Sequence, residues 1–106
     1  MDVPLSRSLH ALADPTRRQI LALLRQRDRT AGEIAGHFSI SAPSVSHHLA
    51  VLKQAGLARA ERNGQTIVYS LNATVVQELL QELLSFFDVG ADAEPGADQP
   101  GVNRYA

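Results

Sequence analysis

The segment over residues 30–71 constrains the fold of this chain more than any other part of the sequence. Thr30 and Glu33 have the S/T-x-x-E spacing of a capping box, in which two groups at a helix start satisfy each other, so a short helix begins there. A tight turn follows, and Ser41 is suited to cap a second helix over about residues 42–55. Two helices joined by so short a turn predict a helix-turn-helix unit.

A two-stranded hairpin is expected directly after this second helix. Gly56 has the place of a left-handed cap that ends the helix. Residues 57–62 and 65–71 then flank Asn63-Gly64, a dipeptide typical of tight hairpin turns because both of its positions tolerate a positive φ. A helix-turn-helix followed by a hairpin is the order of a winged helix, and this order points to double-stranded DNA.

Three further helices are expected outside this segment. Leucines spaced i, i+4 and i+7 predict a first helix over residues 4–13, and Asp14-Pro15 supplies the N-cap and first-turn proline of the next. Asn72 is suited to cap a last helix that runs to about Phe87. The expected fold is therefore mainly α with a β-hairpin wing: about five helices plus a two-stranded hairpin over residues 57–71.

The composition is that of one small domain followed by a tail. Residues 88–106 are rich in glycine, proline and alanine and carry four acids and one base, which predicts a disordered acidic tail after a domain over residues 1–87. The chain has no cysteine, which excludes disulfides and thiolate metal sites. It also has no apolar run of the kind that a membrane span or a signal peptide needs, so we expect a cytoplasmic protein without membrane contact.

The formal net charge of −1 conceals a basic middle segment. From Arg17 to Arg62 there are eight basic residues and three acidic residues. Such an excess suits a surface that faces phosphates, although a solvated surface of mixed charge would have the same composition.

Three motifs in the chain have a recognisable order and spacing. They are L-x-A-L-A-D-P-T-R-R-x-I-L-x-L-L over residues 9–24, S-x-S-H-H-L-x-V-L-K-x-A-G-L over residues 44–57 and R-N-G-Q-T-I-V-Y-S-L over residues 62–71. Together they resemble the ArsR/SmtB family of bacterial winged-helix repressors, over about residues 5–87. The resemblance implies a homodimer, paired through its first and last helices, that binds an operator with dyad symmetry and represses transcription.

The metal sites of that family's best-known members have no counterpart in this sequence. The site on the third helix needs a Cys-x-Cys type pair, whereas residues 30–35 read T-A-G-E-I-A. The site on the last helix needs histidines, whereas residues 72–87 offer only Glu78 and Glu82, two hard oxygen ligands that do not make a transition-metal site alone. We therefore expect neither a metal nor a cofactor, as in the family's non-metal, autorepressor-like branch. The sequence leaves open whether an inducer or a sequestering partner exists.

The helix over about residues 42–55 carries the side chains expected to read DNA bases. Placing Val45 inward turns small hydroxyls and imidazoles outward, with Ser44 and His48 facing away from the core, where they can reach base edges in the major groove. The base-reading candidates are Ser44, Ser46, His47 and His48. Helix starts and basic side chains are expected to contact phosphates or the minor groove. These candidates are Thr30, Ser41, Arg17, Lys53, Arg62 and Gln65.

The same residues have plainer interpretations. Ser44 and Ser46 could serve as ordinary helix caps, and the two adjacent histidines could bind a metal or have only a surface role. Neighbouring positions on a helix point about 100° apart, which makes it difficult for His47 and His48 to chelate one ion.

The first and last helices carry more apolar surface than one packing face needs. An ordered unit of about 85 residues is marginally stable alone, so a homodimer is expected, with a wholly intramolecular core as the alternative. The predicted interface residues are Leu5, Leu9, Leu12, Val76, Leu79, Leu80, Leu83, Leu84 and Phe87.

Two other functions are open to a winged helix of this size. A protein-docking module that had lost DNA binding would carry acidic or apolar groups on the recognition helix and wing, which this sequence does not show. An enzyme would need a catalytic constellation, and the sequence has no cysteine, no Gly-rich phosphate loop and no evident Ser-His-acid set. The sequence therefore favours a dimeric, sequence-specific transcriptional repressor, and not an enzyme.

Overall fold

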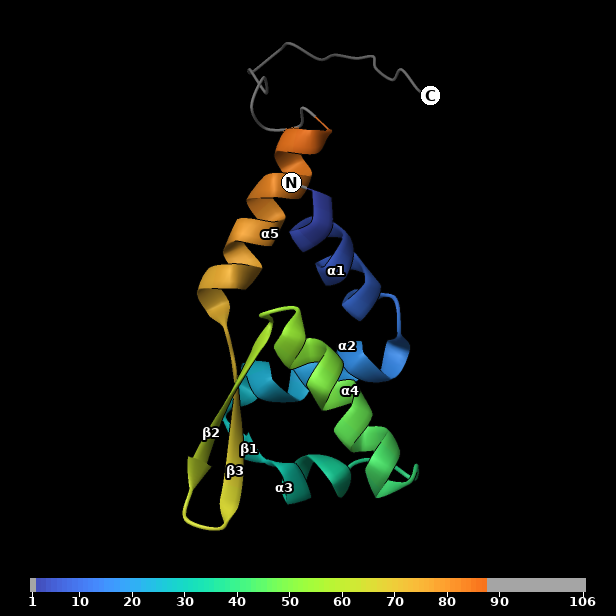
Figure 1. Ribbon diagram of the computed structural model, residues 1–106, viewed down its shortest axis with the longest axis vertical. Helices are drawn as coiled ribbons and strands as arrows, with labels where there is room; N and C mark the ends of the chain where they lie inside the picture. The colour runs from blue at the N-terminus through green and yellow to red at the C-terminus, as the bar shows by residue number, and fades with distance from the viewer. Residues whose placement is uncertain (1, 88–106) are drawn as a thin grey trace. The chain divides into compact units, whose positions relative to one another are not determined.

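The structure is a computed structural model of the 106-residue chain and describes residues 2–87 (Figure 1). Its helices are α1 (Asp2–Leu12), α2 (Pro15–Gln26), α3 (Ala31–Ala35), α4 (Ala42–Gln54) and α5 (Ala73–Phe86). Its strands are β1 (Arg29–Thr30), β2 (Ala58–Asn63) and β3 (Thr66–Leu71). The chain divides into two compact units, Met1–Val76 and Gln77–Ala106, and the tail predicted over residues 88–106 lies outside the described residues.

Local hydrogen bonds set the starts of the central helices. Asp14 accepts a hydrogen bond from the backbone N–H three residues ahead, and Pro15 occupies the first turn of α2. Thr30 and Glu33 form both bonds of the capping box of α3, and Ser41 caps α4 in the same way as Asp14 caps α2. Each bond satisfies an N–H group that the helix itself leaves unpaired. The starts of α2, α3 and α4 are therefore as predicted.

The sheet differs from the predicted two-stranded hairpin in two respects. β1 pairs antiparallel with β3, so the sheet has three strands in the order β1-β3-β2. The turn consists of Gly64 and Gln65 rather than Asn63-Gly64, because Asn63 pairs with Thr66 in the ladder. Gly64 has a φ of +69°, which a residue without a Cβ adopts without strain. Gly64 can occupy a position in either turn, so the Asn63-Gly64 dipeptide does not determine which residues of β2 and β3 pair.

The core of the first unit consists of one apolar stripe from each of its packed helices together with apolar residues at the base of the hairpin. Its most buried large side chains are Ile20, Leu24, Ile34, Val45, Leu49, Leu52 and Leu57. Burying each such side chain contributes roughly 1.5–3 kcal/mol, so the three from α4 determine which face of that helix is turned outward. Gly56, with a φ of +80°, ends α4 and turns the chain into the hairpin, as predicted.

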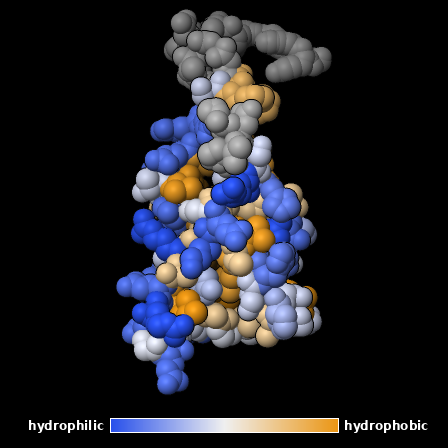
Figure 2. All heavy atoms as spheres, in the orientation of Figure 1, coloured by the Kyte–Doolittle hydropathy of each residue, from blue (hydrophilic) through white to orange (hydrophobic). Residues whose placement is uncertain are grey.

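The last helix exposes much of its apolar surface. Leu79 is buried, whereas Leu80 and Leu84 are about half exposed and Phe87 more so. Figure 2 shows hydrophobic atoms at the surface of the C-terminal part of this helix. None of the helices described by the structure is long and apolar enough to cross a membrane.

Candidate nucleic-acid interface

α4 has a polar outer face opposite its buried stripe. Val45 and Leu49 are each 2% exposed, whereas Ser44, Ser46 and His47 are exposed on the N-terminal half of the helix. Serine hydroxyls and imidazole nitrogens can donate or accept hydrogen bonds at base edges in the major groove. In Figure 1, α4 follows α3 after the short turn, and the contacts of α4 with β2 and of α3 with β3 bring the hairpin next to this pair of helices.

The serines at the start of α4 are a capping residue and two exposed residues that follow it. Ser41 Oγ accepts from the Ser44 N–H at 3.2 Å and donates to Ser44 Oγ at 3.0 Å. Ser41 thus has the capping role, while Ser44 and Ser46 are exposed beyond the cap. A hydroxyl has one donor and two acceptor sites, so these contacts leave Ser44 able to bond to a base.

His48 does not face outward as predicted. Its side chain is only 16% exposed, and its Nδ1 lies 3.1 Å from Arg17 Nη1 and 3.8 Å from Asp14 Oδ2. The physical reason is its spacing from Val45, because residues three apart share a face of a helix. The same spacing could have indicated this partial burial from the sequence.

Arg17 is buried instead of facing phosphates. The residue is 6% exposed, its Nε donates to the carbonyl of Ala11 at 2.7 Å, and its Nη2 donates to the carbonyl of His10 at 3.0 Å. These carbonyls belong to the last turn of α1, where a helix has no further turn to pair its acceptors. The carbonyl of His10 also accepts from the Ala13 N–H at 3.1 Å. The predicted DNA contact of Arg17 is therefore corrected: its guanidinium caps α1 and reaches α4 inside the fold.

A second buried arginine also alters the interpretation of the charge. Arg29 is 8% exposed, and it donates to the carbonyl of Leu23 at 3.1 Å and to Gln26 Oε1 at 2.7 Å. Arg17 and Arg29 are both counted in the basic middle segment of the sequence. The count therefore overstates the positive charge that this segment has available for phosphates.

The hairpin carries exposed polar groups at its tip. Arg62 lies near the end of β2, Gln65 lies in the turn, and both are exposed. On the face drawn in Figure 2, hydrophilic side chains predominate over this part of the molecule. Lys53, in the last turn of α4, is also exposed. These three side chains remain available for phosphate or minor-groove contacts.

Thr30 is half-buried at the start of α3. Its N–H donates to Glu33 Oε1 at 2.9 Å, and this hydrogen bond holds the pKa of that carboxyl below its usual value. The ionised Glu33 also lies 3.7 Å from Arg27. A carboxylate at the start of α3 repels a phosphate, so the surroundings of Thr30 are less suited to a phosphate contact than those of the serines of α4.

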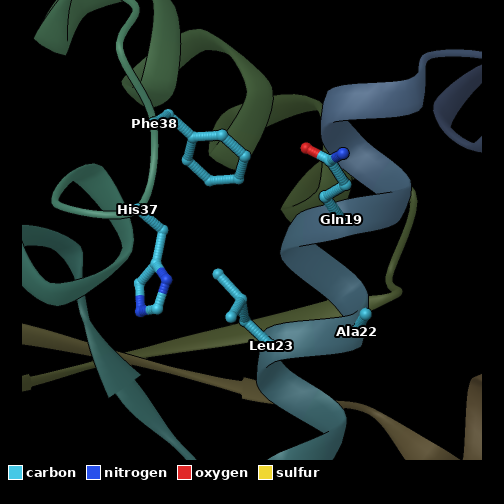
Figure 3. Close-up of a pocket in the computed structure, with 5 residues that line it drawn as sticks. All are labelled: Gln19, Ala22, Leu23, His37 and Phe38. Atoms are coloured by element: carbon cyan, nitrogen blue, oxygen red, sulfur yellow. The ribbon is translucent and has the colours of Figure 1, made fainter.

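His37 lies in a separate hollow between α2 and the segment that follows α3. Figure 3 shows His37 and Phe38 on one side of this hollow and Gln19, Ala22 and Leu23 of α2 on the other. Its neighbours are therefore an amide and apolar groups, which are poor transition-metal ligands. Within residues 2–87, no three histidine or acidic side chains are grouped so that they could hold a metal ion.

Comparison with known proteins agrees with this architecture. A family profile described as "Bacterial regulatory protein, arsR family" matches residues 14–60, from the cap of α2 into β2. The transcriptional repressor SdpR of Bacillus subtilis (strain 168) is 55% identical over 80 residues, which cover 76% of this chain and 89% of SdpR. The chain belongs to the ArsR family.

Two further matches each cover more than four fifths of this ArsR-family chain. The HTH-type transcriptional regulator KmtR of Mycobacterium tuberculosis (strain ATCC 25618 / H37Rv) is 45% identical over 94 residues, covering 89% of this chain and 66% of KmtR. The crystal structure of an ArsR family transcriptional regulator superposes with a TM-score of 0.70 at 28% identity, covering 83% of this chain and 94% of that one. The ArsR-type winged helix-turn-helix fold is thereby confirmed. The protein is a DNA-binding transcriptional regulator and not an enzyme.

Proposed function

We propose that this ArsR-family protein is a homodimeric, sequence-specific repressor that binds an operator with dyad symmetry. Ser44, Ser46 and His47 of α4 contact base edges in the major groove, while the wing over residues 57–71 lies along the backbone or minor groove. The observation that carries this proposal is the exposed polar side of α4 opposite its buried stripe. Repression as the outcome is supported by the name of SdpR, a transcriptional repressor.

Exposed apolar side chains on two helices support the homodimer. Leu9 of α1 is 43% exposed, and Leu80 and Leu84 of α5 are 55% and 49% exposed in the single chain. A second copy that covers these groups removes apolar surface from water, which stabilises association. Two copies related by a two-fold axis carry two α4 helices, so they suit an operator with two matching half-sites about one helical turn apart.

A DNA titration tests the proposed function. We expect a dyad-symmetric fragment of the protein's own promoter to bind at least about 1,000-fold more tightly than a random duplex of equal length, at the same salt concentration. Fluorescence anisotropy measures both affinities, and a fragment with one half-site scrambled is the matched control. Equal affinity for the operator fragment and the random duplex contradicts sequence-specific binding.

We propose further that metals do not regulate this protein through the usual family sites. The chain has no cysteine, and α5 has no histidine. Added zinc, nickel or copper should therefore change operator affinity by less than about threefold. Stoichiometric, tight zinc binding that releases DNA contradicts this proposal, and His37, His47 and His48 are then the ligands to substitute.

A further inference from the structure

One buried arginine joins three helices of the DNA-binding unit. Arg17 of α2 donates to the carbonyls of His10 and Ala11 of α1 at 3.0 and 2.7 Å. Its Nη1 lies 3.1 Å from Nδ1 of His48 on α4. His48 is next to His47 in the sequence. The contact therefore anchors α4 at a position adjacent to a side chain that is proposed to read bases. Because Arg17 is only 6% exposed, it is placed for contacts inside the fold and not for a surface contact with phosphate.

The hydrogen bond between Arg17 and His48 can form with only one protonation state of the imidazole. An arginine guanidinium has donors only, so Nδ1 of His48 must accept the hydrogen bond. The imidazole is then neutral and carries its proton on Nε2. A second proton would occupy the lone pair of Nδ1 and remove the acceptor, so the contact is open to disruption by a proton.

The charged groups around the His48 ring determine what a second proton does. Among the described residues, Arg17 and Asp14 approach the ring from α2 and its cap, at 3.1 and 3.8 Å from Nδ1. His47 is its neighbour on α4, with ring centroids 5.8 Å apart, and α1 contributes main-chain carbonyls to Arg17. A proton on Nδ1 faces the guanidinium as a like charge, and Asp14 is the acceptor that it can turn to. Protonation therefore breaks the bond between Arg17 and α4.

We infer that Arg17 and His48 form a proton-sensitive link that positions the recognition helix, so that operator binding requires neutral His48 and weakens when His48 takes up a proton. The inference rests on the proposed function, because its readout is operator binding. It adds that operator binding is controlled by a pair of residues behind the proposed DNA-facing side of α4. Arg17 acts here as a positioning residue through His48, without touching DNA.

The first experiment compares the wild-type chain with His48→Asn and His48→Ala at about pH 8 and about pH 5.5. Asparagine places an oxygen at the δ position, where it can accept from Arg17, and it does not titrate, whereas alanine removes the acceptor. We expect the wild type to lose about tenfold in operator affinity on acidification, and His48→Ala to lose about that much already at the higher pH. His48→Asn should recover most of the alanine loss and show little pH dependence.

His47 is unchanged in all three proteins, so a pH dependence that does not involve His48 appears in all three profiles. The difference between the wild-type and His48→Asn profiles therefore reports on His48. A His48→Asn profile that falls as steeply as that of the wild type would overturn the inference, as would unaltered operator affinity in His48→Ala.

The second experiment removes the other half of the link. Arg17→Gln is expected to lose about tenfold in operator affinity and to flatten the pH profile. Arg25→Gln is the matched control, because it removes the same charge from an exposed position of α2 and should leave the pH profile as in the wild type. An Arg17→Gln protein that is folded and retains the wild-type profile contradicts the link.

Nitrogen-15 NMR of the unsubstituted full chain tests the link even if Arg17→Gln does not fold. At about pH 8 we expect the His48 proton on Nε2 and an unprotonated Nδ1. A proton on Nδ1 at that pH would overturn the inference. If operator binding is specific but does not change with pH or with these substitutions, the inference is wrong and the proposed function stands. If the wild-type chain shows no specific binding at either pH, the proposed function is contradicted as well.

Discussion

Leu80→Asp and Leu83→Asp are each expected to convert the protein from a dimer into a monomeric or unfolded chain. If α5 forms the interface, each substitution buries a carboxylate without a partner in both copies, at a cost of several kcal/mol. Leu80 is 55% exposed in the single chain, so its replacement there removes little packing. Light scattering at micromolar concentration measures the mass directly.

A neighbouring polar position provides the control for this prediction. Gln81 is exposed on the same helix, and Gln81→Asp should remain a dimer because a charge at a solvated position costs little. Circular dichroism separates a folded monomer from an unfolded chain. If both leucine variants remain dimers of wild-type mass, α5 is not the interface and the exposed Leu9 of α1 becomes the position to substitute.

The elements that the sequence predicted are those with a local side-chain signature. Asp14, Thr30 and Ser41 each cap the helix that their spacing indicated, and Gly56 takes the positive φ expected of a helix end. Such signatures act over three or four residues, so one chain segment contains all the information. β1 was missed because a strand of two residues, Arg29–Thr30, has no periodicity and exists only through its pairing with β3.

The errors in the candidate site have two different physical origins. The prediction that His48 faces outward was wrong, although its spacing of three from the buried Val45 is visible in the sequence. That spacing is enough to predict that His48 is partly buried. The burial of Arg17 could not be predicted in that way. It depends on two carbonyls in the last turn of α1, six and seven residues back along the chain, and on an imidazole 31 residues ahead. A charged residue is buried when the tertiary fold supplies such partners.

These corrections concentrate the proposed DNA contacts on fewer residues. With Arg17 and His48 engaged inside the fold, the proposed base reading rests on Ser44, Ser46 and His47. The proposed backbone contact rests chiefly on Arg62, with Gln65 and Lys53. The two groups lie on different elements, α4 and the hairpin, so substitutions can separate base reading from phosphate contact.

His47→Ala should therefore weaken operator binding by about 1–3 kcal/mol per half-site while leaving the affinity for random DNA nearly unchanged. The physical reason is that a base-edge hydrogen bond forms only with the correct base pair. A dimer carries the substitution twice, so the total effect on a two-half-site operator is expected to be roughly double. Anisotropy titrations with operator and random duplexes measure both affinities.

Arg62→Ala is the matched contrast, because a phosphate is the same in every sequence. It should weaken operator and random DNA by similar factors and reduce the slope of log affinity against log salt by about one for each phosphate that is no longer neutralised. Gln65→Ala, at the same tip but uncharged, should leave that slope unchanged. If the salt slope of Arg62→Ala is the same as that of the wild type, Arg62 does not neutralise a phosphate. Equal losses of affinity for both duplexes in His47→Ala mean instead that His47 contacts phosphate, and that base reading falls to the two serines.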